Sequence, residues 1–114
     1  MHLIDTEVAD TQPRRMQGLM YRRELPGNKG MVFVFDQADA HCMWMKNTLI
    51  PLTVAFMDDS GTILNLADMQ PQSETNHCAK GRARYALEMR QGWFAAKGIR
   101  EGDRISGVER LMAR

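Results

Sequence analysis

The sequence predicts one mainly β domain, a compact antiparallel β-sandwich or partly closed barrel with one or two short helices. At 114 residues the chain has the usual length of one domain, so residues 1–114 are expected to form a single unit. Short apolar runs recur between clusters of turn-forming residues. Because no long helical segments separate these runs, an antiparallel arrangement is favoured.

The N-terminal part is predicted to hold a strand, a short helix and a loop. Residues 3–9 combine β-branched side chains with rough alternation. Thr11 is a candidate helix N-cap, and the helix is expected to run to about Tyr21. The loop covers residues 25–30, which are rich in Gly and Pro. Three apolar residues at helical spacing should share one face of the helix: Met16, Leu19 and Met20.

The middle of the chain is predicted to form a buried strand and a hairpin. Residues 31–35 are continuously apolar and too few for a helix, which is typical of a strand buried on both faces. Residues 52–57 and 62–66 flank a Gly-containing turn and are expected to pair as a hairpin. Asp58 and Asp59 lie in that turn, where local backbone hydrogen bonding explains them better than acid-base chemistry.

Residues 41–47 are predicted to be a further strand that ends before Pro51. Its alternation would place Cys42, Trp44 and Lys46 on one face and Met43, Met45 and Asn47 on the other.

The C-terminal part is predicted to contain a long surface loop over residues 70–81 and a strand over residues 84–89. One or two helical turns are expected over residues 92–97, and a last strand over residues 103–108.

The charge balance argues against an electrostatic partner. Fifteen Lys and Arg against fourteen Asp and Glu give a formal charge of +1, so no strong field attracts nucleic acid or an anionic membrane. No apolar run is long enough for a membrane span. A local basic cluster is interpreted as a solvated helix face: Arg14, Arg15, Arg22 and Arg23.

The start of the chain bears on localisation. No basic start followed by an apolar stretch is present, and the chain begins directly on a predicted strand, as expected if an export signal has been removed. The start of the chain by itself leaves two localisations open: exported or periplasmic, and cytoplasmic.

Two cysteines, Cys42 and Cys78, leave two states open: one disulfide or two free thiols. Each follows a histidine, and these dipeptides together with ten methionines suggest copper. Adjacent strand residues face opposite ways, however, and methionine also fills ordinary cores, so we assign no metal and no cofactor.

The segment Met43-Trp44-Met45-Lys46-Asn47-Thr48 is the best candidate for function. Three bulky side chains are followed in the sequence by a cation, an amide and a hydroxyl. This mixture suits a pocket for a small polar or anionic ligand. The alternative is structural, with the large side chains in the core and the polar ones at the bend before Pro51.

Five motifs resemble those of one family, the domain of unknown function 192, in the same order: GLMYR at 18–22, GMVFVF at 30–35, WMKNTLIPL at 44–52, ALE at 86–88 and GIREGD at 98–103. This bacterial and archaeal family has no established activity. The resemblance implies a compact, mainly antiparallel β fold. It also implies export for many members, which favours an exported or periplasmic protein over a cytoplasmic one. The family usually has aromatic residues where this chain has Cys42 and Met43, so a cysteine-based function would be particular to this chain and its near relatives.

Three hypotheses follow. The first is a non-catalytic binding module for a small molecule, with these candidate contacts: Met20, Arg22, Trp44, Lys46, Asn47, Thr48 and Glu88. The second is an enzyme, such as a hydrolase, with Glu88 as base and Lys46 as its electrostatic partner. The third is a structural or protein-interaction domain that uses a strand edge or a Met-rich surface. No recognised catalytic motif is present, so no catalytic residue is assigned.

Overall fold

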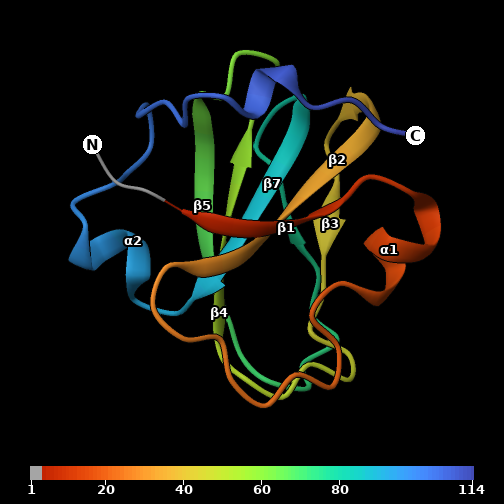
Figure 1. Cartoon of the computed structure of the whole chain (residues 1–114), viewed down its shortest axis with the longest axis vertical. Coiled ribbons are helices and arrows are strands. Elements are labelled where there is room, and N and C mark those ends of the chain that lie inside the picture. Colours follow the sequence, from red (N-terminus) through yellow and green to blue (C-terminus); the bar gives the residue numbers. More distant parts are fainter. Residues whose placement is uncertain (1–3) are drawn as a thin grey trace.

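A computed structural model describes residues 4–114, and its main element is an open, twisted five-stranded sheet (Figure 1). The strand order is β1-β2-β7-β4-β5. The bounds are Asp5–Ala9 for β1, Lys29–Asp39 for β2, Leu52–Met57 for β4, Ile63–Met69 for β5 and Ala83–Arg90 for β7. The mainly β prediction is confirmed. Leu3, where the first predicted strand begins, lies outside the described residues.

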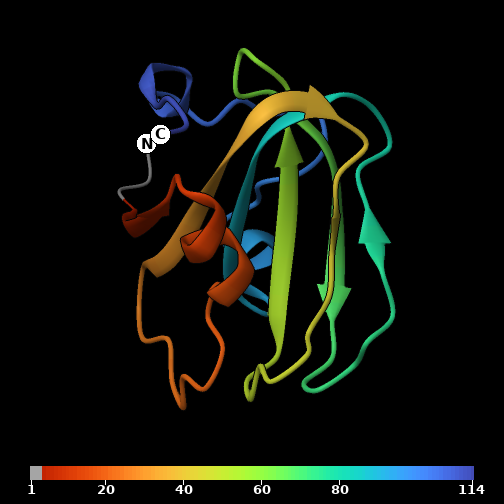
Figure 2. The same cartoon turned by 90° about the vertical axis from the view of Figure 1, so that its right-hand side faces the viewer.

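The smaller elements lie around this sheet. A second sheet pairs β3 (Cys42–Met43) with β6 (His77–Cys78). The helical elements are α1 (Gln12–Gln17), α2 (Trp93–Ala96) and a 3₁₀ turn, η1 (Val108–Arg110). Figure 2 shows β6 at one side of the main sheet and the C-terminal residues at the other.

One strand pair departs from the antiparallel arrangement. β1 runs parallel to β2, whereas β2, β7, β4 and β5 pair antiparallel in turn. A parallel pair needs a long crossover, and the segment that contains α1 supplies it. β1 and β5 remain as the two edges, so the main sheet does not close into a barrel.

The central strands are buried on both faces, as predicted for residues 31–35. Phe33 and Phe35 pack into one core cluster, and Val32 and Val34 pack into a second cluster on the opposite face. The second cluster includes Trp93 of α2 and residues near the C-terminus. Because neither face of these strands meets water, apolar residues run continuously through them.

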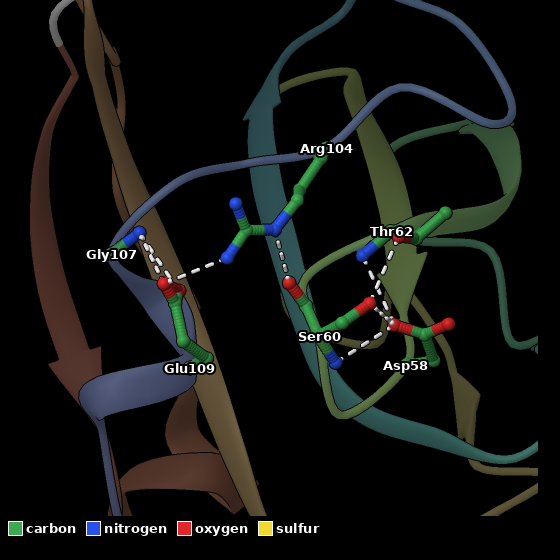
Figure 3. A network of polar contacts seen from close by, with 6 residues as sticks. All are labelled: Asp58, Ser60, Thr62, Arg104, Gly107 and Glu109. Carbon is green, nitrogen blue, oxygen red and sulfur yellow. Dashed lines mark hydrogen bonds and ion pairs between the residues drawn. The ribbon is translucent and has the colours of Figure 1, made fainter.

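The predicted hairpin is confirmed, with β4 and β5 paired from Leu52↔Met69 onward. Asp58 holds its turn, as Figure 3 shows: one carboxylate oxygen accepts from the Ser60 amide (2.9 Å), the Ser60 hydroxyl (2.7 Å) and the Thr62 amide (3.1 Å). Arg104 donates to the Ser60 carbonyl (2.8 Å) and pairs with Glu109 (3.1 Å). These contacts attach the C-terminal segment to the hairpin turn.

The predicted last strand over residues 103–108 is wrong. Its one β feature is an isolated bridge between Thr62 and Arg104. The chain then turns at Gly107, whose φ of 93° is incompatible with an extended strand, and enters η1.

The first helix is shorter than predicted. Thr11 caps it through a 3.4 Å bond from the Arg14 amide, as expected. The helix ends at Gln17, because Gly18 adopts a φ of 51° and turns the chain. Leu19 is buried, but Met16 is 69% exposed and does not face the core, contrary to the expectation of a shared apolar face.

The predicted strand over residues 41–47 is correct only for Cys42–Met43, and the predicted loop over residues 70–81 contains β6. Cys42 lies directly opposite Cys78 in this small ladder, and the two form a disulfide (S–S 2.02 Å). Of the two states that the sequence leaves open, a disulfide and two free thiols, the structure has the disulfide. It joins the polar segment 70–81 to the residues just after β2.

Replacing Cys42 and Cys78 with Ser should lower the free energy of unfolding by about 4 kcal/mol. The bridge joins residues 36 positions apart and so restricts the unfolded chain. Urea denaturation of the oxidised protein and the double Ser variant measures the difference. Dithiothreitol should lower the urea midpoint of the wild type to that of the variant and leave the variant's midpoint unchanged. Equal urea midpoints of the two proteins without reductant would show that the bridge contributes no stability.

Candidate functional site

A pocket of about 260 Å³ opens on the sheet face that carries the first core cluster. Its floor includes side chains of β2 and β7. Its walls come from α1, the residues just after it, β3 and the turn that follows β3. Figure 1 shows α1 and β3 toward the same side of the molecule. Segments distant in sequence therefore meet at this site.

Glu88 lies at the floor of the pocket. It sits on β7 between Met31 of β2 and Val54 of β4, so apolar residues flank it on both neighbouring strands. The side chain is only 4% exposed, and burial raises the pKa of its carboxyl to about 8. Within residues 4–114, no hydrogen bond or charge contributes to this pKa shift. The carboxyl is therefore protonated at neutral pH and lacks a polar partner in the described chain.

The walls of the pocket are aromatic and sulfur-rich. Phe33 and Phe35 are buried below the opening, whereas Trp44 is 43% exposed at its edge. Three methionines also line the pocket: Met16, Met20 and Met43. Phe35 stacks on His41 with ring centroids 3.8 Å apart, which fixes the ring orientation.

Arg15 is the cation among the described lining residues, and its guanidinium is already engaged. It donates to the Val34 carbonyl at 2.8 Å and pairs with Asp36 at 3.3 Å. Thr48 supplies a buried hydroxyl, which donates to the Lys46 carbonyl at 3.3 Å. Two amides, Gln12 and Gln17, complete the polar lining.

Residues 44–48 form a turn because contacts from distant segments hold it. The Met45 amide donates to the Ser73 carbonyl (2.8 Å), and the Asn47 carbonyl accepts from the Tyr21 amide (2.8 Å). Asn47 adopts a φ of 58°, a left-handed conformation that Asn tolerates better than most residues. This geometry overturns the predicted strand faces. Trp44 and Thr48 both line the pocket, while Asn47 forms the bend.

Four of the seven predicted contact residues line one pocket, namely Met20, Trp44, Thr48 and Glu88. The other three do not line it. Lys46 extends over the Trp44 ring, with its ammonium 5.4 Å from the centroid. Arg22 binds both carboxylate oxygens of Glu7 (2.7 and 2.8 Å), and this pairing lowers the pKa of Glu7. No charge of Lys46 acts on the pKa of Glu88, so the electrostatic partnership proposed for them is absent from the described structure.

Sequence reasoning missed Arg15, Phe33 and Phe35 as pocket residues. The helical spacing of Met16, Leu19 and Met20 predicts that Arg15 lies on a solvated face, whereas Arg15 lines the pocket. The two phenylalanines alternate along β2 and carry an ordinary core pattern. The GMVFVF motif at 30–35 contains both phenylalanines and is the signal that could have found them, whereas no motif contains Arg15.

A larger hollow of about 800 Å³ lies on the opposite sheet face, under the C-terminal segment. Its walls include Val32, Leu87 and Ile105. Two of its charged residues are already bonded: Asp103 accepts from the Arg100 amide, and Arg104 bonds Ser60 and Glu109. The pocket above Glu88 is the stronger candidate because it contains a carboxyl without a partner.

Comparisons with known proteins identify a family and a fold. A model of the family DUF192, described as “Uncharacterized ACR”, matches residues 1–107. A candidate transcription regulator from Sinorhizobium meliloti 1021 is similar in structure, with a TM-score of 0.86 and 36% identity over 90% of this chain and 81% of its own. A protein of unknown function from Novosphingobium aromaticivorans has a TM-score of 0.87 and 36% identity, over 90% and 74% respectively. No curated protein matches. None of the helices in residues 4–114 is long and apolar enough to cross a membrane.

Replacing Glu88 with Gln should remove a pH dependence of stability. The pKa of this carboxyl rises on folding from its ordinary 4.5 to about 8. Below pH 4.5 the folded and the unfolded states both hold the proton. Between pH 4.5 and about pH 8 only the unfolded state loses it, so stability falls as pH rises and levels off above pH 8. At pH 7 this penalty amounts to about 3 kcal/mol.

Chemical denaturation from pH 4 to pH 8 measures this effect. Glu88→Gln and the wild type should be equally stable near pH 4, and the variant should be more stable by about 3 kcal/mol at pH 7. Glu101→Gln, an identical change at an exposed position, is the matched control and should follow the wild type. Parallel stability curves for Glu88→Gln and the wild type would contradict the raised pKa.

Proposed function

The chain belongs to the DUF192 family of uncharacterised proteins, and we propose that it is a binding module for a small organic molecule held in the pocket above Glu88. The buried carboxyl carries this proposal. A carboxyl placed among apolar side chains without a partner destabilises the fold. A ligand that hydrogen-bonds to it would supply the missing partner, and perturbed acids of this kind concentrate at functional sites.

The size of the pocket suggests a compact ligand. Pockets for drug-sized molecules measure roughly 300–1,000 Å³, and this one, at about 260 Å³, lies just below that range. Its aromatic and thioether walls suit an apolar body. Glu88 and Thr48 provide polar contacts at fixed positions on rigid backbone.

The charges around the pocket alter the ligand class that the sequence suggested. The sequence predicts a small polar or anionic ligand, with Arg22 and Lys46 among the candidate contacts, but Arg22 is paired with Glu7 and Lys46 lies over Trp44. Arg15, the cation that does line the pocket, is paired with Asp36. A polar ligand that is neutral or positively charged therefore fits better than an anion.

Binding explains the site better than catalysis does. A carboxyl with a pKa of about 8 is suited to proton transfer near neutral pH. Among the described lining residues, however, Glu88 is the one carboxyl, no histidine is present, and Cys42 is held in the disulfide. An acid-base pair or an activated nucleophile would need a second such group.

We also propose that the protein works in an oxidising compartment such as the periplasm. The bridge between Cys42 and Cys78 supports this, since disulfides persist there and are rare in the cytosol.

Thiol labelling of the protein, trapped with acid from the cells that produce it, tests the compartment. Both cysteines should resist alkylation until reductant is added, because an oxidising compartment keeps the bridge closed. The double Ser variant gives the background signal. Full labelling of both cysteines before reduction would place the chain in a reducing compartment.

A thermal-shift screen of compact amines, alcohols, amides and carboxylates tests the binding proposal. At least one compound should raise the Tm of the wild type, since an excess of about a hundredfold over Kd stabilises a protein by about 2.7 kcal/mol. Met20→Trp, which adds a ring to a lining position, should abolish the shift, whereas the exposed control Glu101→Gln should retain it.

Tryptophan fluorescence offers a second readout of the same screen. Trp44 borders the pocket and is partly exposed, whereas Trp93 is fully buried on the opposite sheet face. Ligand should therefore alter the emission of Trp44 alone. If no compound shifts the Tm, or if Met20→Trp responds as the wild type does, the pocket is not a binding site.

A further inference from the structure

We propose that the ligand is an organic ammonium ion, whose N–H groups donate to the carboxylate of Glu88 while its apolar part contacts the aromatic and thioether walls. This inference rests on the proposed function and specifies the ligand class for the same pocket. Two geometric observations support it: Glu88 is the one ionisable group at the floor without a charged partner, and the walls are aromatic and thioether. The release of a proton is a consequence that can be measured.

The floor of the pocket holds one acid, and none of the groups facing it supplies a free positive charge. Glu88 on β7 is opposed by the apolar Met31 and Val54 on the two strands beside it. Above it, α1 contributes the charged Arg15, whose guanidinium is neutralised by Asp36 of β2. β3 contributes Cys42 in its disulfide, and the turn after β3 contributes the uncharged Thr48. Among these facing groups, Glu88 is the one ionisable side chain without a charged partner.

The walls are also suited to a cation. Aromatic faces attract ammonium groups through their quadrupole, and such contacts strengthen when water is excluded. Trp44 already attracts one cation, because the Lys46 ammonium lies 5.4 Å from its ring centroid. Phe33 lies deeper in the pocket, and the thioether of Met20 adds a polarisable surface that carries no positive charge of its own.

Binding an ammonium ion requires Glu88 to give up a proton. The free carboxyl, with a pKa of about 8, is protonated at pH 7. An ammonium donor needs a carboxylate acceptor, so the Glu88 O–H bond breaks and its proton passes to the solvent. About nine-tenths of a proton should be released per ligand at pH 7. Affinity should therefore rise about tenfold per pH unit below pH 8.

A neutral acceptor would behave in the opposite way. A carbonyl or hydroxyl oxygen would accept a hydrogen bond from the protonated carboxyl, and no proton would be released. Its affinity would be constant at neutral pH and would fall above pH 8, where Glu88 ionises. The pH dependence of binding therefore distinguishes the two ligand classes.

Three probes of matched shape test the inference: cyclohexylammonium, cyclohexanol and cyclohexanecarboxylate. Trp44 fluorescence measures each affinity at pH 6 and pH 7, and calorimetry in two buffers of different ionisation enthalpy measures the protons released. Cyclohexylammonium should bind the wild type and Glu101→Gln about tenfold more tightly at pH 7 than at pH 6. Glu88→Gln, which keeps the shape but not the charge, should weaken binding at pH 7 by tenfold or more.

The outcomes separate this inference from the proposed function. If cyclohexanol or cyclohexanecarboxylate binds more tightly than the ammonium ion, and Met20→Trp abolishes that binding, the pocket is a binding site but the ligand is not a cation. If cyclohexylammonium binds equally well to Glu88→Gln, or binds without proton release, the inference is wrong. If none of the three probes and no compound of the wider screen binds, both proposals fail.

Discussion

The pairing of β7 with β2 on one side and β4 on the other is the constraint on which the rest of the molecule depends. These antiparallel registers make β7 the central strand and determine the face of each of its side chains. Leu87 and Met89 point into the second core cluster, whereas Glu88, one residue away from each, points to the opposite face. If the pairing of β7 shifted by one residue, the acid Glu88 would point into the second core cluster in place of a large apolar side chain.

The walls around Glu88 depend on weaker elements that a covalent bond stabilises. β3 and β6 have two residues each, and strands this short rarely persist alone. The bridge from Cys42 to Cys78 holds them together. The turn after β3 is fixed from outside by two backbone hydrogen bonds, one that the Ser73 carbonyl accepts and one that the Tyr21 amide donates, so the pocket forms only when the distant segments have assembled.

Glu88 occupies a position where a carboxyl is costly for stability. An apolar residue at this position would pack among Met31, Val54 and the phenylalanines without a desolvation penalty. The carboxyl retains that penalty, yet it offers a hydrogen-bonding group at the base of a rigid pocket, where backbone pairing on both sides prevents displacement. Under the proposed function, a ligand that pairs with the carboxyl would recover part of the lost solvation, and binding would depend on the protonation state of Glu88.

The sequence by itself determined the mainly β class, the doubly buried strand at residues 31–35 and the hairpin, because local periodicity and turn residues encode which faces are apolar. It also singled out seven candidate contacts, four of which line the pocket: Met20, Trp44, Thr48 and Glu88. Only the tertiary structure decided that β1 is parallel, that residues 103–108 do not form a strand, and that Lys46 and Arg22 lie outside the pocket. Distant hydrogen bonds, ion pairs and the disulfide settle those features, and local spacing cannot report contacts between segments far apart in the chain.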